Sequence, residues 1–473
     1  MNKYKNLAFN TVVFTIGSFS SKIISLLLNN LYTKHISPPQ LYTKNLIETL
    51  ALFMIPVFTL SMGEAVIRFG LDGSTDKKKV FTTSSALTLS GLLLTAAVVP
   101  FIQYIPFFSS VGSYTVLLMI YISTSALRAQ CSQFVRAREL VKLFSLDGIL
   151  TTFWLLIFNI IFISHLGMGV KGFMISVILS DLCSSVFLFI TAGLRKYIDR
   201  RAFSPQLGKS MLLFCLPLIP TTVMWTFTGF SDQLFISGMK GESPAGIYSA
   251  ATKIPNLISM LSTIFFQAWN MSAITENDSE DRNVFYEKVY GAYEAVLYIG
   301  AAGLILLVKP VSALLINYSV YPEYRGACIY TPLLITAAVF TCLDLFLASI
   351  YTATKHTVNA FVTILAAGLS NIVLNLLLIP RLGIQGAALA TFISYLVCFI
   401  IRMIDARRFV PFRFSLVTSI SGTALLLGMC AAAIFRPKGY IVILAVMTAV
   451  MAAISAKSLL PMIKAVLRRV KRA

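Results

Sequence analysis

Long apolar segments recur along this sequence, and they constrain its fold more than any other feature. A helix that spans the hydrocarbon core of a bilayer needs about 20 consecutive apolar residues. Segments that meet this requirement predict an all-α polytopic membrane protein with about 14 transmembrane helices. The predicted spans cover residues 7–33, 41–66, 80–102, 113–135, 143–164, 171–194, 210–237, 245–269, 289–308, 328–352, 357–379, 384–404, 414–434 and 439–459.

The composition agrees with a membrane protein and excludes several other classes. Of the 473 residues, 57% are hydrophobic and only 12% are charged, which is about half the charged share of an ordinary soluble protein. A soluble chain of this length could not bury so much apolar surface. The sequence therefore excludes a soluble enzyme, a secreted disulfide scaffold and a disordered protein.

Basic residues set the expected orientation. The chain carries 39 Lys and Arg against 19 Asp and Glu, a net charge of +20. Because the predicted number of spans is even, both termini lie on the same side of the membrane. With the termini in the cytoplasm, most basic residues fall in cytoplasmic loops, as the positive-inside rule requires. We expect a multi-pass membrane protein with both termini cytoplasmic, and the positive charge then indicates no nucleic-acid partner.

Cysteine and histidine show no pattern of a metal or cofactor site. The seven cysteines are scattered without a CxxC motif, and the three histidines lie near span ends. The sequence also lacks the Walker glycine loop that binds ATP phosphates. It therefore predicts no transition-metal site, no cofactor, no catalytic residues and no ATP-driven step within this chain.

The first twelve predicted spans show a weak internal repeat. Segment 34–42 matches segment 240–248 at its Lys, Ser, Pro and Tyr residues, and both segments join an outgoing span to a returning one. Parallel repeats are typical of transporters whose substrate site lies between two halves. We predict an N-terminal lobe at 1–203, a C-terminal lobe at 204–405, and two further helices with a basic cytoplasmic tail at 406–473.

Several motifs, in order and spacing, resemble those of bacterial polysaccharide and oligosaccharide lipid flippases. They are the segment 63–69 that ends span 2, the segments 232–236, 246–254 and 266–269 in spans 7 and 8, and the segments 321–334 and 383–388 before spans 10 and 12. The resemblance implies the multidrug/oligosaccharidyl-lipid/polysaccharide (MOP) exporter superfamily, in which two six-helix lobes surround a central cavity and work by alternating access. A count of fourteen spans resembles the lipid-linked glycan branches, including the peptidoglycan lipid flippases, whereas the multidrug branch typically has twelve.

Four cations inside or at the end of the predicted spans are candidates for substrate binding. They are Lys22, Arg68, Arg128 and Lys253. An ionisable side chain in the membrane normally faces a cavity or a partner, and a lipid-linked oligosaccharide carries a diphosphate that needs cations in place of water. The alternatives are snorkelling to the interface or an internal ion pair. Glu64, one helical turn before Arg68, offers such a pair.

Acidic residues inside the spans form a second set of candidates. The predicted cavity acids are Glu48, Asp181 and Asp344. Asp181 lies in the middle of span 6, where a cation of span 1 or span 4 is its expected partner. Asp147 and Glu294 lie near the cytoplasmic ends of their spans, where we expect them to be close to water.

A third set of residues fits an alkali cation. Asp232 lies in span 7, Asn371 and Asn375 share one face of span 11, and Thr391 lies in span 12. Carboxylate, amide and hydroxyl oxygens are the ligands that such a cation prefers. The set resembles the sodium site of the peptidoglycan lipid flippases, although that branch typically has a second carboxylate where Asn375 stands. The alternative is hydrogen bonding between helices.

These observations favour a flippase over two other functions. The expected function is to move an undecaprenyl-diphosphate-linked oligosaccharide from the inner to the outer leaflet, with sodium or proton coupling, for cell-surface polysaccharide synthesis. Its expected partners are this lipid-linked substrate, the bilayer and a glycan polymerase or assembly complex. One alternative is a cation-coupled multidrug exporter of the same superfamily. The other is an integral-membrane glycosyltransferase, which usually carries an acidic pair in a long first outer loop that is absent from residues 35–40.

Overall fold

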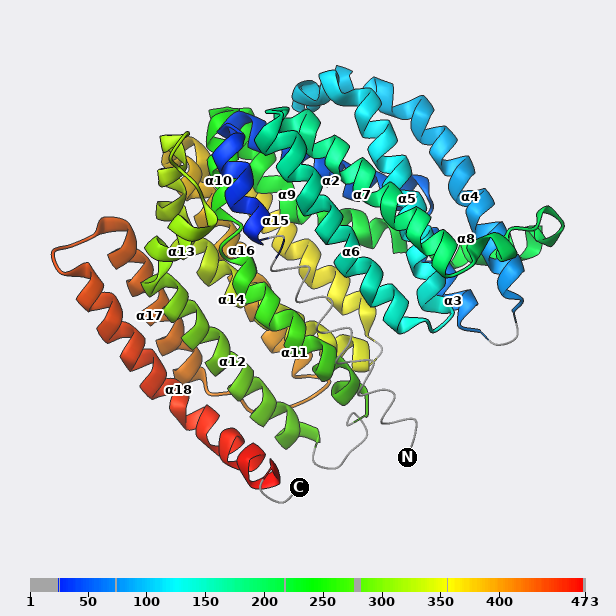
Figure 1. The fold of residues 1–473 in the computed structure, drawn as a ribbon. Coiled ribbons are helices and arrows are strands. Elements are labelled where there is room, and N and C mark those ends of the chain that lie inside the picture. Colours follow the sequence, from blue (N-terminus) through cyan, green and yellow to red (C-terminus); the bar gives the residue numbers. More distant parts are fainter. Residues whose placement is uncertain are drawn as a thin grey trace. The chain divides into compact units, whose positions relative to one another are not determined.

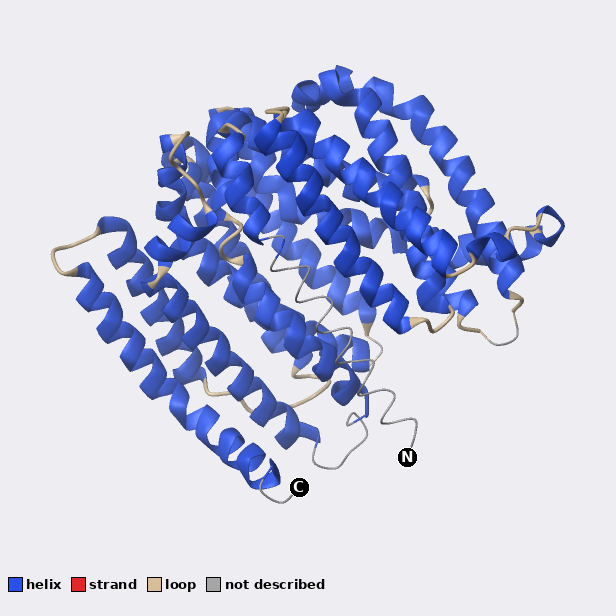
Figure 2. Cartoon of the chain, in the orientation of Figure 1, coloured by secondary structure: helices blue, strands red, loops and turns tan. Residues whose placement is uncertain are grey.

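The structure, a computed structural model, describes residues 24, 26–72, 75–216, 218–275, 282–354 and 356–470. All regular secondary structure in these residues is helical (Figure 2). The predicted all-α fold of a polytopic membrane protein is therefore confirmed.

Figure 1 labels most of the α-helices in chain order. The α-helices are α2 (Pro38–Phe58), α3 (Met62–Gly70), α4 (Lys77–Val98), α5 (Thr115–Ala137), α6 (Val141–Asn159), α7 (Gly169–Thr191), α8 (Pro205–Cys215), α9 (Leu218–Lys240), α10 (Glu242–Ala251), α11 (Asn256–Thr275), α12 (Arg282–Leu306), α13 (Val308–Leu315), α14 (Ala327–Ala353), α15 (Thr357–Leu382), α16 (Ile384–Ala406), α17 (Leu416–Phe435) and α18 (Tyr440–Val470). Shorter helical turns are η1 (Val99–Tyr104), η2 (Pro106–Tyr114), η3 (Ile160–His165), η4 (Leu194–Tyr197), η5 (Arg200–Ala202) and η6 (Pro322–Gly326).

Ten helical segments among the described residues are long and apolar enough to cross a membrane. They coincide with the predicted spans 2 to 6 and 9 to 13. The apolar part of α18 coincides with predicted span 14, and most of predicted span 1 lies outside the described residues.

Span 2 was predicted as one continuous helix, and this prediction is wrong. Helix α2 ends at Phe58 and α3 begins at Met62. Between them Leu60 and Ser61 have φ values of 52° and 51°. Residues with a side chain rarely adopt this left-handed conformation, which cannot continue a right-handed helix. The backbone therefore turns sharply about two thirds of the way along the span.

Span 8 is also interrupted where a single helix was predicted. Helix α10 ends at Ala251 before α11 begins at Asn256. Pro255 explains the break, because proline has no N–H to donate to the preceding turn. This span thus consists of two half-helices. In predicted span 7 the structure describes α8 up to Cys215 and α9 from Leu218.

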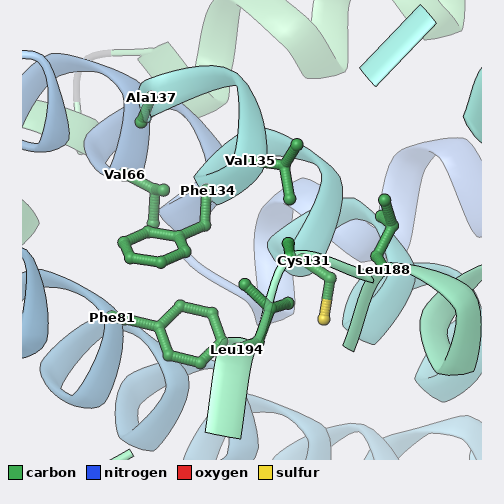
Figure 3. Close-up of a cluster of buried hydrophobic side chains, with 9 residues drawn as sticks. Val66, Phe81, Cys131, Phe134, Val135, Ala137, Leu188 and Leu194 are labelled. Carbon is green, nitrogen blue, oxygen red and sulfur yellow. The ribbon is translucent and has the colours of Figure 1, made fainter. Parts of the chain in front are cut away.

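The chain forms two compact units. The first contains residues 1–234 and 319–321, and the second contains residues 235–318 and 322–473. The predicted lobes at 1–203 and 204–405 remain a prediction. In the first unit, a buried apolar cluster joins α3, α4, α5, α7 and η4 (Figure 3). Cys131 of α5 belongs to it, one helical turn after Arg128, so this cluster fixes the part of α5 that carries the arginine.

Helix α14 lies at the centre of the second unit. It packs against α10, α11, α12, α15, α16 and α17. At one end, Phe346 stacks on Trp269 with ring centroids 4.7 Å apart, and the indole N–H of Trp269 donates to the Ser349 hydroxyl at 2.8 Å. The C-terminal helix α18, 31 residues long, packs against α12 and α17.

Candidate functional site

The break in span 8 places a cation beside a helix end. Lys253 lies between α10 and α11, two residues after Ala251 and three before Asn256. The N-terminal end of a helix carries a partial positive charge and N–H groups without helical partners. Lys253 is half-buried, so its charge and that of the α11 end lie in the same part of the second unit.

Arg68 lies near the end of α3, which follows the break in span 2. Both Arg68 and Glu64 are exposed, and no ion pair joins them in the described part of the chain. The Glu64–Arg68 pair offered by their spacing is therefore not formed. Lys22, the fourth predicted cation, lies outside the described residues.

Arg128 is held by two acids rather than left alone. Its guanidinium lies 3.8 Å from a carboxylate oxygen of Asp147 and 3.7 Å from one of Asp181. Arg128, Asp147 and Asp181 come from α5, α6 and α7, respectively. Both carboxylates are buried, whereas the side chain of Arg128 is 30% exposed. The structure thus gives Asp181 the span 4 partner that was one of its two expected cations. The expectation that Asp147 lies close to water is wrong, because α7 covers it.

Two serines complete this group, which we call the Arg128 cluster (Arg128, Asp147, Asp181, Ser125 and Ser184). Ser184 donates to Asp147 Oδ1 at 2.5 Å and accepts from Arg128 Nε at 3.2 Å. Ser125 donates to Asp181 Oδ2. Hydroxyl donors stabilise the charged form of a carboxylate.

Sequence reasoning singled out Glu48 but not its partner. Lys44 is buried, and its ammonium donates to Glu48 at 2.7 Å. It also lies over the rings of Tyr32 and Phe173, 4.7 Å and 4.5 Å from their centroids. An ion pair and two aromatic faces offset the cost of burying this cation. Its four-residue spacing from Glu48 was the available signal.

The second unit buries Asp344 beside an arginine that the sequence analysis did not single out. Arg402 donates from Nε to the Thr363 hydroxyl at 2.9 Å, and from its other two nitrogens to the backbone carbonyls of Asp344 and Ala360. Neither carboxylate oxygen of Asp344 has a hydrogen-bond partner among the described residues. The position of Arg402 inside predicted span 12 was the signal that could have revealed it.

Glu294 is the other buried acid of the second unit. Its Oε1 accepts from Ser419 at 2.6 Å and from Tyr290 at 3.3 Å, which links α12 to α17. The expectation that Glu294 lies close to water is wrong, because its side chain is buried in this contact.

The predicted sodium ligands divide between the two units. Asp232 of α9 is buried in the first unit. In the second unit, Asn375 of α15 donates to Asn371 at 3.0 Å, and Thr391 of α16 donates to the carbonyl of Ala387 at 3.0 Å. The sodium site itself remains a prediction. Among the described residues no group of His, Cys, Asp and Glu is arranged to hold a metal ion.

Comparison with known families identifies the chain. A family model described as polysaccharide biosynthesis protein matches residues 7–270, which is more than half of the sequence. The chain belongs to the polysaccharide biosynthesis protein family. A curated relative, the uncharacterized membrane protein YabM of Bacillus subtilis strain 168, is 27% identical over 207 residues. That match covers 40% of this chain and 37% of the relative.

Solved structures with the same fold are transporters of the MOP superfamily and a lipid flippase. The lipid II flippase MurJ, in an inward closed conformation, aligns with a TM-score of 0.71 over 94% of this chain and 98% of its own, at 16% identity. An inward-facing multidrug resistance transporter of the MATE family aligns with a TM-score of 0.66 over 82% of this chain and 95% of its own, at 17% identity. At such identities the likeness shows the fold alone.

Proposed function

We propose that this protein is a flippase that moves an undecaprenyl-diphosphate-linked oligosaccharide from the inner to the outer leaflet by alternating access. Its family description and its fold support a role in cell-surface polysaccharide synthesis. We place it in the bacterial cytoplasmic membrane with both termini in the cytoplasm. A glycan polymerase or assembly complex would take up the product on the outer side.

The position of Lys253 carries this proposal. A diphosphate that enters the membrane must exchange its water for positively charged groups. An interrupted span supplies positive charge from two sources, because the ammonium of Lys253 and the partial positive charge at the N-terminal end of α11 lie next to one another along the chain. Half-helix N-termini bind anionic substrate groups in other transporters. Lys22 and the exposed Arg68 are the further cations that we assign to the substrate.

The multidrug alternative receives less support from the same geometry. Export of cationic drugs calls for acidic groups that are available to the substrate. Asp181 is held by Arg128, and Glu48 is held by Lys44. The glycosyltransferase alternative is disfavoured by the fold, which the chain shares with transporters and a flippase.

A gene deletion with analysis of lipid-linked saccharides tests the proposal and names the substrate. We expect one lipid-linked oligosaccharide to accumulate, by mass spectrometry, while its surface polymer disappears. Unchanged levels of both would contradict the flippase function, and uptake of cationic dyes would then test drug export.

Complementation of the deletion tests the role of Lys253. Lys253→Gln keeps the length and polarity of the side chain but removes its charge, so we expect the lipid-linked oligosaccharide to accumulate at normal protein levels. Lys253→Arg keeps the charge and should restore most of the surface polymer. Lys309→Gln is the matched control, because Lys309 lies at the start of α13 with its ammonium over the ring of Tyr440. Full complementation by Lys253→Gln would remove this residue from the substrate site.

The coupling ion requires a separate test. If sodium drives the cycle through Asp232, Asn371, Asn375 and Thr391, Asp232→Ala should abolish the sodium dependence of transport in proteoliposomes. Sodium dependence that survives this substitution would exclude the set.

A further inference from the structure

The Arg128 cluster contains more negative than positive charge. Asp147 and Asp181 reach the same guanidinium from two different helices, and that guanidinium is the one cation within 4 Å of either carboxylate among the described residues. With both acids ionised, the cluster has a net charge of −1. A buried net charge inside a membrane protein is costly, and it is normally neutralised by a partner or a proton.

The hydrogen bonds show where a proton would bind. Ser184 donates to Asp147 Oδ1, and Ser125 donates to Asp181 Oδ2. Asp147 Oδ2, by contrast, is buried and accepts no hydrogen bond from the residues that the structure describes, since the nearby Thr151 hydroxyl donates to the backbone carbonyl of Asp147 at 2.7 Å. Its distance of 3.8 Å from Arg128 is that of an ion pair and exceeds a hydrogen bond.

Within the described part of the chain, the other titratable groups around the cluster supply no second positive charge. The phenol of Tyr121 and the thiol of Cys131, both on α5, face Asp181 and Asp147 respectively, and both groups are neutral at physiological pH. On the neighbouring α2, the carboxylate of Glu48 interacts electrostatically with the phenol of Tyr121. Glu48 is itself paired with Lys44 at 2.7 Å.

We propose that Asp147 and Asp181 together bind one exchangeable proton, which lies on Asp147 Oδ2 when Arg128 bridges the two acids. The site takes a proton and no larger ligand, because the orphan oxygen is buried. It is independent of the sodium candidate set, with which it shares no residue.

A link to transport follows if the protein is the flippase proposed above, and this step rests on that function. Arg128 is 30% exposed and is therefore within reach of an anion. A phosphate that draws the guanidinium away leaves the two acids facing one another, and like charges favour proton uptake. Anion binding and proton binding at this cluster would then strengthen each other.

Infrared difference spectra of the full-length protein in liposomes, recorded across pH steps, test the proton site without any substrate. We expect the C=O band of a buried carboxylic acid to appear on acidification, and Asp147→Asn to remove it from that pH range, because Asp181 alone then faces Arg128. Asp181→Asn leaves one acid opposite one cation, so the band should appear only at lower pH. Asp344→Asn, which removes a buried acid of the second unit, should leave the pH-dependent band in place.

Two results would overturn the proposal: survival of the band at an unchanged pH in Asp147→Asn, or its loss in Asp344→Asn. Should Asp147→Asn fail to fold, Ser184→Ala decides. Loss of the hydroxyl that stabilises ionised Asp147 should move the midpoint of the band up by about one pH unit, and an unchanged midpoint would exclude Asp147. Because no substrate is used, failure of the flippase function would leave this test intact.

Discussion

The two units bury an arginine and an acid in opposite ways. In the first unit, Arg128 is shared by two carboxylates at ion-pair distances, and its guanidinium is partly exposed. In the second, Arg402 is buried and donates to two backbone carbonyls and a hydroxyl, while the carboxylate of Asp344 accepts from no N–H or O–H group of the described residues and has the weak thiol donor of Cys398 beside it.

This difference separates a structural arginine from one that can change partners. Arg402 joins α14, α15 and α16 by three hydrogen bonds, so its movement would leave buried acceptors unpaired. Arg128 makes one hydrogen bond, to Ser184, and its two ion pairs exceed hydrogen-bond length. A charge held in this loose manner can be exchanged for a proton or an anion, whereas Arg402 fixes the interior of its unit.

Replacing Arg402 should have the largest effect on stability. Arg402→Met removes three bonds at the centre of the second unit, and we expect a loss of about 3–5 kcal/mol, typical of breaking a buried charged network. A marked fall in the unfolding temperature of the purified protein would show it. The matched control is Arg408→Met, since Arg408 is exposed and makes one 3.4 Å contact with Asp405. Equal behaviour of the two variants would refute the structural role of Arg402.

Arg128→Met should cost less, about 1–2 kcal/mol, because Arg128 is partly exposed and the remaining acids can take up protons. The same thermal unfolding measurement applies, at more than one pH. We expect the loss to shrink as the pH falls, since protonated acids no longer repel each other. A loss as large as that of Arg402→Met, or one independent of pH, would contradict the comparison.

Thr363→Val tests one bond of the Arg402 group with little change in shape. It removes the acceptor of Nε, which is 2.9 Å away, and we expect a loss of about 1–2 kcal/mol. Thr363→Ser keeps the hydroxyl and should be the milder variant. If Thr363→Ser is as destabilising as Thr363→Val, the methyl group matters here and the hydrogen bond does not.

The smallest effect is expected at Glu294, a third buried acid that two neutral hydroxyls bind. Ser419→Ala removes the shorter bond and should cost about 1 kcal/mol, while Tyr290→Phe removes the longer one and should cost about 0.5 kcal/mol. Thermal unfolding of both variants would establish the order. The reverse order would mean that the bond within α12 contributes more to stability than the bond between α12 and α17.

Hydropathy alone predicts most of this fold, because each spanning helix must be about 20 apolar residues long. Hydropathy does not predict the breaks in spans 2 and 8. Nothing in the residue types of Leu60 and Ser61 indicates the first break, and only Pro255 indicates the second. The sequence predicts which charged residues belong to the candidate site, but it does not predict which of them pair with each other. Asp181 was recognised as an acid in need of a cation, yet helix packing rather than spacing brings it to Arg128. Arg402 lies two residues from the end of its predicted span, where an arginine more often reaches the interface.

The C-terminal helix α18 is longer than the hydrocarbon core of a bilayer is thick. At 1.5 Å per residue, the 31 residues of α18 extend over about 46 Å, whereas the hydrocarbon core is about 30 Å thick. Its final turns, which include Lys464, Arg468 and Arg469, therefore continue as a rod beyond the apolar layer. What the sequence suggested as a basic tail is therefore a helical continuation of α18, the helix that packs against α12 and α17.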